Sequence, residues 1–213
     1  MEVFNKIEQD IATEIVNIGL AKAGDSLSFF TQEKVFISGK DLKLERICDN
    51  ELFKKSLEPL TVLSTEIRGD MKGYCYLIFD KEDTERLFKL SFPASILENK
   101  EHLEEMGTGM LMEMDNIITA AVVTQFSNLF QLDMHGYVPE FFKGTKKETI
   151  DHIMNHAEAG SFLLHFSTSF SSGETDISPE FLWCLDESFV NAIKSYTQKD
   201  KVVAKSVGNE KNL

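Results

Sequence analysis

The chain has 213 residues, 42% of them hydrophobic, which is enough for one large core or two small ones. Its 35 acidic and 22 basic residues give a formal net charge of −13, which argues against nucleic acid and anionic membrane surfaces as partners and fits a basic protein surface. Three scattered cysteines without a CxxC spacing argue against a disulfide framework or a zinc knuckle, and fit a reducing compartment. No run approaches the roughly 18 apolar residues of a membrane span, and the acidic N-terminus is no signal peptide, so we expect a cytoplasmic protein.

The first half of the chain predicts a long helix, three strands and a short helix. Over residues 4–30, apolar side chains recur at spacings of three, four and seven, the period of an amphipathic helix. Runs rich in β-branched or aromatic residues predict strands over 34–38, 60–67 and 73–80, with a hairpin turn at 71–73. A short helix is expected over 81–92, because acids occupy its first turn and Pro93 follows its end.

The same order of elements then begins again. A second long helix is predicted over 98–130 despite Gly107 and Gly109, and it is followed by a strand over 134–142 and a helix over 146–159. Two strands and a helix complete this half, over 161–170, 179–186 and 187–196. The tail from Thr197 has little to bury and is predicted to be disordered through residue 213.

The two halves match at a fixed offset. Laying Glu14 on Glu113 (113 − 14 = 99) also lays Asn17 on Asn116, and apolar positions fall on apolar positions toward the end of each helix. Such internal similarity indicates a duplicated unit. We therefore predict a single domain over 1–196, made of repeats at about 1–95 and 96–196, with one shared core, one continuous sheet and an approximate two-fold axis.

Each long helix carries a Glu and an Asn three residues apart. Side chains at that spacing project from the same face of a helix and can act on one target. One such pair is ordinary helix sequence, since Glu is favoured and Asn tolerated in helices. Two pairs at equivalent positions indicate a function.

The stretch from Asp10 through Glu14 to Asn17 resembles the signature of the chemotaxis phosphatases CheC, CheX and FliY: an Asp or Ser, three residues, Glu, two residues, Asn, and later a Pro. In the second copy, Glu113 and Asn116 repeat the pair, and 22 residues separate Asn116 from Pro139, as in the family signature. The resemblance covers nearly the whole chain. It implies an α/β (α+β) CheC-like fold, in which two long motif helices lie on a mostly antiparallel sheet.

Each copy departs from the family pattern once. The first copy has Lys40 where the signature has Pro, and the second has Gly109 where it has an acid or Ser. Glu and Asn are present in both copies. Some members of the family have two working sites and others one, so the number of working sites stays open here; we expect both pairs to bind the partner, with Asp10 intact in the first copy and the Pro139 loop intact in the second.

The resemblance implies hydrolysis of the aspartyl phosphate of a CheY-like response regulator. Asn17 or Asn116 would orient a water for in-line attack, since a carboxamide both accepts and donates hydrogen bonds. Glu14 and Glu113 would dock on a Lys of the regulator. The chain would bind no cofactor of its own, and Mg²⁺ would arrive with the regulator. Family members differ in forming a homodimer and in binding a CheD-like deamidase, so both partners stay open here.

Two other functions compete with this one. A non-catalytic binding or adapter protein of the same fold, as in the flagellar switch, is compatible with Lys40 and Gly109. A metal-dependent hydrolase could be built on His152 and His156, which stand at i and i+4, although no third ligand is obvious and solvated helix histidines are the simpler interpretation.

Small and flexible residues surround the second pair. The four methionines at 106, 110, 112 and 114 could form an adaptable contact surface, but core packing between helices is the simpler interpretation. Gly107 and Gly109 could let the helix bend or pack closely.

Overall fold

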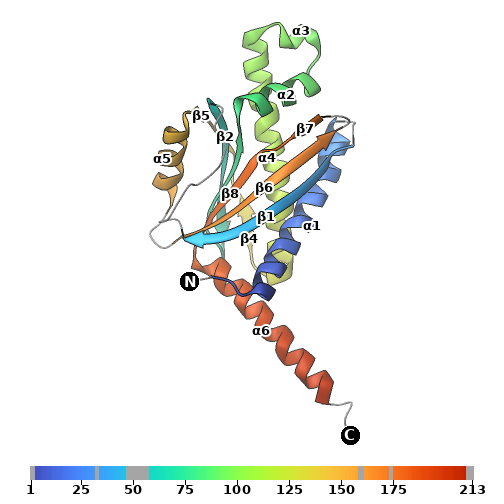
Figure 1. Ribbon diagram of the computed structural model, residues 1–213, viewed down its shortest axis with the longest axis vertical. Coiled ribbons are helices and arrows are strands. Elements are labelled where there is room, and N and C mark those ends of the chain that lie inside the picture. Colours follow the sequence, from blue (N-terminus) through green and yellow to red (C-terminus); the bar gives the residue numbers. More distant parts are fainter. Residues whose placement is uncertain (1–2, 32–33, 47–57, 158–160, 173–174, 210–213) are drawn as a thin grey trace.

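The computed structural model describes residues 3–31, 34–46, 58–157, 161–172 and 175–209 (Figure 1). Its first half comprises α1 (Lys6–Thr31), β1 (Phe36–Arg46), β2 (Leu60–Gly69), β3 (Gly73–Phe79), α2 (Lys81–Ser91) and α3 (Ala94–Leu97). Its second half comprises α4 (Lys100–Phe130), β4 (Met134–Gly136), β5 (Glu140–Gly144), α5 (Lys146–His156), β6 (Phe162–Ser172), β7 (Thr175–Ile177), β8 (Glu180–Leu185) and α6 (Glu187–Asn209).

The strands form one eight-stranded antiparallel sheet with a symmetric order. Its main path is β1-β6-β8-β3-β2-β4, while β5 pairs with the other part of β2 and β7 pairs with β6. The order is symmetric about the central pair of β8 and β3. Moving outward from this pair, β6 and then β1 lie on one side, and β2 and then β4 with β5 lie on the other. The structure thereby confirms the α/β fold class, the mostly antiparallel continuous sheet and the pseudo-two-fold arrangement.

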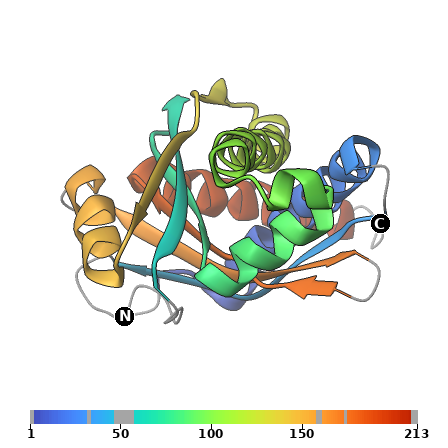
Figure 2. The ribbon, with the colours of Figure 1, turned by 90° about the horizontal axis from the view of Figure 1, so that it is seen from above.

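Helices cover both faces of the sheet (Figure 2). α1, α4 and α6 share the main core with alternate residues of β3, which are Cys75, Leu77 and Phe79. The intervening residues, Tyr76 and Ile78, join a smaller cluster under α5. This period-two alternation is why β3 is apolar along its whole length.

Local signals fix the ends of the helices. The Asp80 carboxylate accepts a hydrogen bond from the Asp83 N–H at 2.9 Å and caps α2, which ends just before Pro93 as predicted. Thr145 and Glu148 form a capping box at the start of α5. These N-caps set where the chain leaves β3 and β5 and enters the following helix.

The two long helices touch most closely at Gly19. A Cβ atom on Gly19 would lie 2.7 Å from the Cα of Val122, so only glycine lets α1 approach the α4 backbone this far. A second link joins the helices farther along, where Lys22 Nζ donates to Gln125 Oε1 at 3.0 Å. Within the described ranges, no helix is long and apolar enough to span a membrane.

Two sequence predictions need correction. The strand predicted over 134–142 is split into β4 and β5, with residues 137–139 between them; Pro139 has no N–H to donate to a ladder. The tail expected to be disordered from Thr197 instead continues α6 to Asn209. Thr197 is buried, and its hydroxyl donates to the Lys194 carbonyl at 2.8 Å, so this residue does find packing.

We expect Gly19→Ala to lower the free energy of unfolding by up to about 2 kcal/mol, because overpacking costs about 1–3 kcal/mol whereas alanine gains only about 1 kcal/mol of helix propensity. Urea denaturation measures the change. Gly109→Ala is the matched control: apart from the nearby backbone of its own helix, no atom of the described residues lies within 4 Å of a Cβ built there, so it should raise stability. Equal effects of the two substitutions would contradict the close crossing.

Candidate functional site

The first Glu/Asn pair lies on α1 facing the edge strand β1. Asp10 and Glu14 are exposed, whereas Asn17 is half-buried. The Gly39 N–H of β1 donates to Asn17 Oδ1 at 3.2 Å, so the carbonyl of this carboxamide already holds a backbone donor. A Cβ on Gly39 would lie 3.3 Å from the same oxygen, so the small residue allows the close approach.

The second pair lies on α4 and is freely presented. Glu113 and Asn116 are both exposed, and no side chain or backbone group of the described residues hydrogen-bonds to the Asn116 carboxamide. Pro139 is buried in the segment between β4 and β5, next to Val138, which is 64% exposed. Asn116 can therefore both accept from and donate to an incoming group.

The fold does not bring the two pairs together. Asn17 bonds to β1, which forms one edge of the sheet, whereas α4 packs on β4 and β5 at the opposite edge. The chain presents two separate candidate sites.

Gly109, where the family signature has an acid or Ser, is exposed on the same helix face as Glu113 and Asn116. Open space surrounds it, so neither an acid nor Ser is sterically excluded. Gly107 is different, because a Cβ there would collide with the Phe88 ring of α2. Close packing explains Gly107, and the bare surface at Gly109 has no packing reason.

The methionines around the second pair divide between core and surface. Met114 is buried in the main core, and Met110 and Met112 pack partly against it. Met106 is 45% exposed. Core packing therefore accounts for most of them, as expected.

Sequence reasoning missed a buried polar cluster directly beneath the second pair. Asp115, between Glu113 and Asn116 in sequence, is 0% exposed, and its Oδ2 accepts a hydrogen bond from the Thr65 hydroxyl of β2 at 2.6 Å. Cys75 Sγ lies 2.9 Å from Thr119 Oγ1 in the same cluster. The available signal was an acid on the apolar stripe of α4, four residues after Leu111 and three before Ile118.

Burial perturbs the titration of this cluster. It raises the pKa of the Asp115 carboxyl to about 7, and the hydrogen bond from Thr65 opposes the rise. Burial and then the charge of Asp115 raise the pKa of the Cys75 thiol, so Cys75 is a neutral core residue and no nucleophile.

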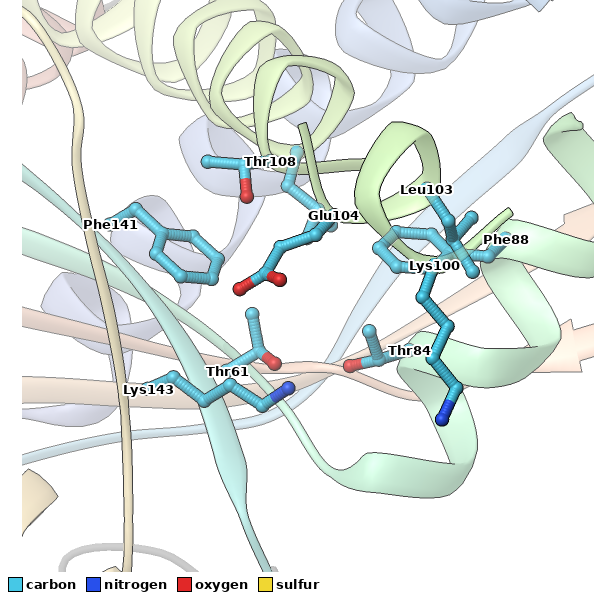
Figure 3. Close-up of a pocket in the computed structure, with 10 residues that line it drawn as sticks. Thr61, Thr84, Phe88, Lys100, Leu103, Glu104, Thr108, Phe141 and Lys143 are labelled. Carbon is cyan, nitrogen blue, oxygen red and sulfur yellow. The ribbon is translucent and has the colours of Figure 1, made fainter. Parts of the chain in front are cut away.

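A separate pocket of about 220 Å³ opens between α2, the N-terminal half of α4, β2 and β5. Figure 3 shows the Glu104 carboxylate, the Lys143 amine and the hydroxyls of Thr61 and Thr108 around it, with Phe88 at one side. Leu103, Leu111 and Phe141 also line it, so these polar groups surround a mostly apolar pocket that suits one amphipathic side chain of a partner. None of the predicted site residues lines the pocket.

The histidine pair on α5 is engaged in packing. His156 stacks on Tyr74 with ring centroids 4.4 Å apart, and its Nδ1 lies 3.1 Å from the Tyr76 hydroxyl. His152 stacks on Phe142 at 4.9 Å. The interpretation of these residues as solvated is therefore wrong. Among the described residues, no group of three or more His, Cys, Asp and Glu side chains could hold a metal.

Comparison with known proteins identifies the fold. No protein-family model and no curated protein matches the chain. FliY of Thermotoga maritima has a similar structure, with a TM-score of 0.72 and 17% identity over 92% of this chain and 98% of that one. CheX of Borrelia burgdorferi, solved with CheY, BeF3 and Mg²⁺, has a TM-score of 0.53 and 18% sequence identity over 82% of this chain and 99% of that one. FliM of H. pylori, solved with FliG, has a TM-score of 0.61 and 10% sequence identity over 88% of this chain and 100% of that one. The chain therefore has the fold of this chemotaxis group, as the sequence predicted.

We expect Asn17→Ala and Asn116→Ala to differ in stability. Loss of the bond from the Gly39 N–H should cost about 0.5–1.5 kcal/mol in Asn17→Ala, because that donor loses its partner. Asn116→Ala, on an exposed helix face, should stay within about 0.5 kcal/mol of wild type. Urea denaturation measures both, and a larger loss in Asn116→Ala would contradict the different environments of the two carboxamides.

Proposed function

We propose that the chain is a phosphatase that hydrolyses the aspartyl phosphate of a CheY-like response regulator, chiefly through the Glu113 and Asn116 pair. The observation that carries the proposal is the exposed Asn116 carboxamide, which no described residue engages, one helical turn from exposed Glu113. The fold, shared with FliY and CheX, supports it.

The chemistry requires little of this chain. An aspartyl phosphate is an acyl phosphate with a good leaving group, and the regulator supplies its own Mg²⁺ to neutralise the phosphoryl oxygens. The missing element is a water held in line with the scissile bond. The Asn116 carbonyl accepts a hydrogen bond from that water, which turns an oxygen lone pair toward phosphorus. The Asn acts by orientation and removes no proton.

Glu113 is the docking group in this proposal. Its carboxylate projects from α4 beside Asn116 and would meet a Lys of the regulator active site through a charge-assisted hydrogen bond. That bond sets the position of Asn116 relative to the phosphoryl group. The formal charge of −13 favours approach of a basic docking surface.

The first pair is the weaker site. Asn17 Oδ1 is committed to the Gly39 N–H, so to accept from a water as well it would need its second lone pair. Glu14 and Asp10 remain exposed and able to dock a regulator. We therefore assign binding to both pairs and most of the turnover to Asn116.

The rival function is an adapter that binds the regulator, or another switch protein, without hydrolysis. The structural similarity to FliM, solved with FliG, favours this rival, and so does Gly109 in the second motif. The proposal places the reaction in the cytoplasm, where such regulators work. A CheD-like deamidase and a homodimer stay predictions from the sequence.

The decisive experiment uses a CheY-like receiver domain of the same organism, phosphorylated with acetyl phosphate in Mg²⁺. Wild type should accelerate loss of the phosphoryl group, and Asn116→Ala should reduce that acceleration by about 10²-fold, because orientation of the water is lost. Asn17→Ala is the matched control and should retain most of the activity. Binding of the BeF3 form of the receiver without any acceleration would establish the adapter instead.

Gly109→Ser supplies a gain-of-function test. The side chain enters open space and restores the family pattern, so we expect faster turnover at a stability no lower than that of wild type. Gly109→Ala, which adds a Cβ without the hydroxyl, is its control. A serine variant no faster than the alanine variant would show that this position contributes nothing to turnover.

A further inference from the structure

The buried acid between Glu113 and Asn116 has no packing explanation. Asp115 is 0% exposed; its Oδ2 accepts one hydrogen bond, from Thr65, and its Oδ1 has no partner among the described residues. Burying a carboxyl with so few partners opposes folding. Asp115 therefore occupies its core position at a cost to stability.

The first half of the molecule shows that helix packing does not need this acid. The offset of 99 places Val16 at the position of Asp115 and Leu20 at that of Thr119. Both are buried, so α1 packs on the sheet through purely apolar contacts at these positions. The polar cluster belongs to the half whose Asn is freely presented.

The cluster joins the two parts of the second motif. Thr65 lies in β2, and a Cβ on Gly136 of β4 would lie 3.1 Å from Thr65 Cγ2 and 3.2 Å from Thr119 Cγ2. The next residue, Tyr137, donates its N–H to the Glu66 carbonyl at 2.8 Å. The helix turn that carries Asn116 and the segment that leads to Pro139 are thus fixed against the same stretch of β2.

We propose that Asp115 is a positioning residue for Glu113 and Asn116: its bond to Thr65 fixes the rotation and height of this turn of α4 on the sheet. Apolar contacts resist separation of a helix from a sheet but permit small slides, whereas a hydrogen bond is directional. The effect of Asp115 on turnover rests on the proposed function. The fixed position of this turn of α4 does not, and it can be measured in the free protein.

The positioning depends on protonation. With a pKa of about 7, Asp115 is neutral below that pH and carries an almost unsolvated charge above it. From the elements packed against it, Cys75 of β3 is the titratable group, while β2 offers Thr65, β4 Gly136 and α4 itself Thr119. Among the described residues no cation balances this charge. The Thr65 hydroxyl donates to the charged carboxylate as well as to the neutral one, so the loosening of the turn on ionisation comes from the cost of the unsolvated charge.

The sign of the stability effect follows from linkage. The folded chain holds the Asp115 proton more tightly than the unfolded chain, whose carboxyl has the ordinary pKa of 3.8. Stability conferred by this group is therefore complete below about pH 4 and is lost as pH rises toward about 7. Asp115→Asn keeps an acceptor for Thr65 and does not titrate, so its stability relative to wild type should grow over this interval.

The test separates positioning from stability with a matched pair of apolar substitutions. Replacing both partners, in Thr65→Val with Asp115→Val, removes the bond without leaving a buried polar group unpaired, so the double variant should be at least as stable as wild type. Measured in an Asn17→Ala background on the acetyl-phosphate-labelled receiver, its turnover should fall by about tenfold or more. Turnover within twofold of wild type would overturn the proposal.

The pH profile is the second readout. Acceleration over the receiver's own decay should fall between pH 6 and pH 8 in wild type and stay flat in Asp115→Asn, with equal rates at the acid end. Hydrogen exchange of backbone amides 113–119, in the free protein, should show the same contrast. If wild type lacks turnover altogether, the proposed function fails and the exchange contrast alone decides; identical exchange profiles in wild type and Asp115→Asn would overturn the positioning role.

Discussion

The close crossing of α1 and α4 at Gly19 is the contact on which the arrangement of both candidate sites depends. Because the Cβ-less Gly19 lets the two helices meet at the Val122 backbone, their inward faces fill one core, while Asn17 lies against β1 and Asn116 is exposed on α4. The pseudo-two-fold order of the sheet extends this geometry to the edges, where β1 accompanies α1 and β4 and β5 accompany α4. One close helix contact thus produces two separated sites.

Divergence between the repeats then makes the sites unequal. In the first half, Gly39 brings an N–H against Asn17 Oδ1, which stabilises the edge strand and occupies the carboxamide. In the second half, the corresponding segment is interrupted before Pro139, and Asn116 is left exposed. A duplicated unit can diverge in this way because both halves contribute to one symmetric sheet and one core, so that in the proposed function one motif binds and the other also reacts.

Much of this was predictable from the sequence, and the failures have physical causes. Helical periodicity located both motif helices, and Pro93 marked the end of α2. Proline chemistry could have predicted the break between β4 and β5 at Pro139. The residues around Pro139 favour β-strand, however, and led to the prediction of one continuous strand. Asp115 was missed because burial of a polar side chain depends on its tertiary partner Thr65, fifty positions away, which no local pattern reveals. The prediction of a disordered tail from Thr197 failed for a similar reason, since amino-acid composition alone does not show where a helix packs on the rest of the fold.

The buried acid also explains how an exposed motif can be held still. In the proposed function, Glu113 and Asn116 must stay free of partners within the chain to meet a regulator, and Gly109 leaves the adjoining surface of α4 bare, so the described residues of the outer face do not fix the turn. Its position must therefore be set from the inner face. Apolar packing does this for α1 through Val16, but there Asn17 is also tied to β1. On α4 the carboxamide is untied, and the directional bond between Asp115 and Thr65 takes over the constraint that the reactive side chain cannot supply for itself.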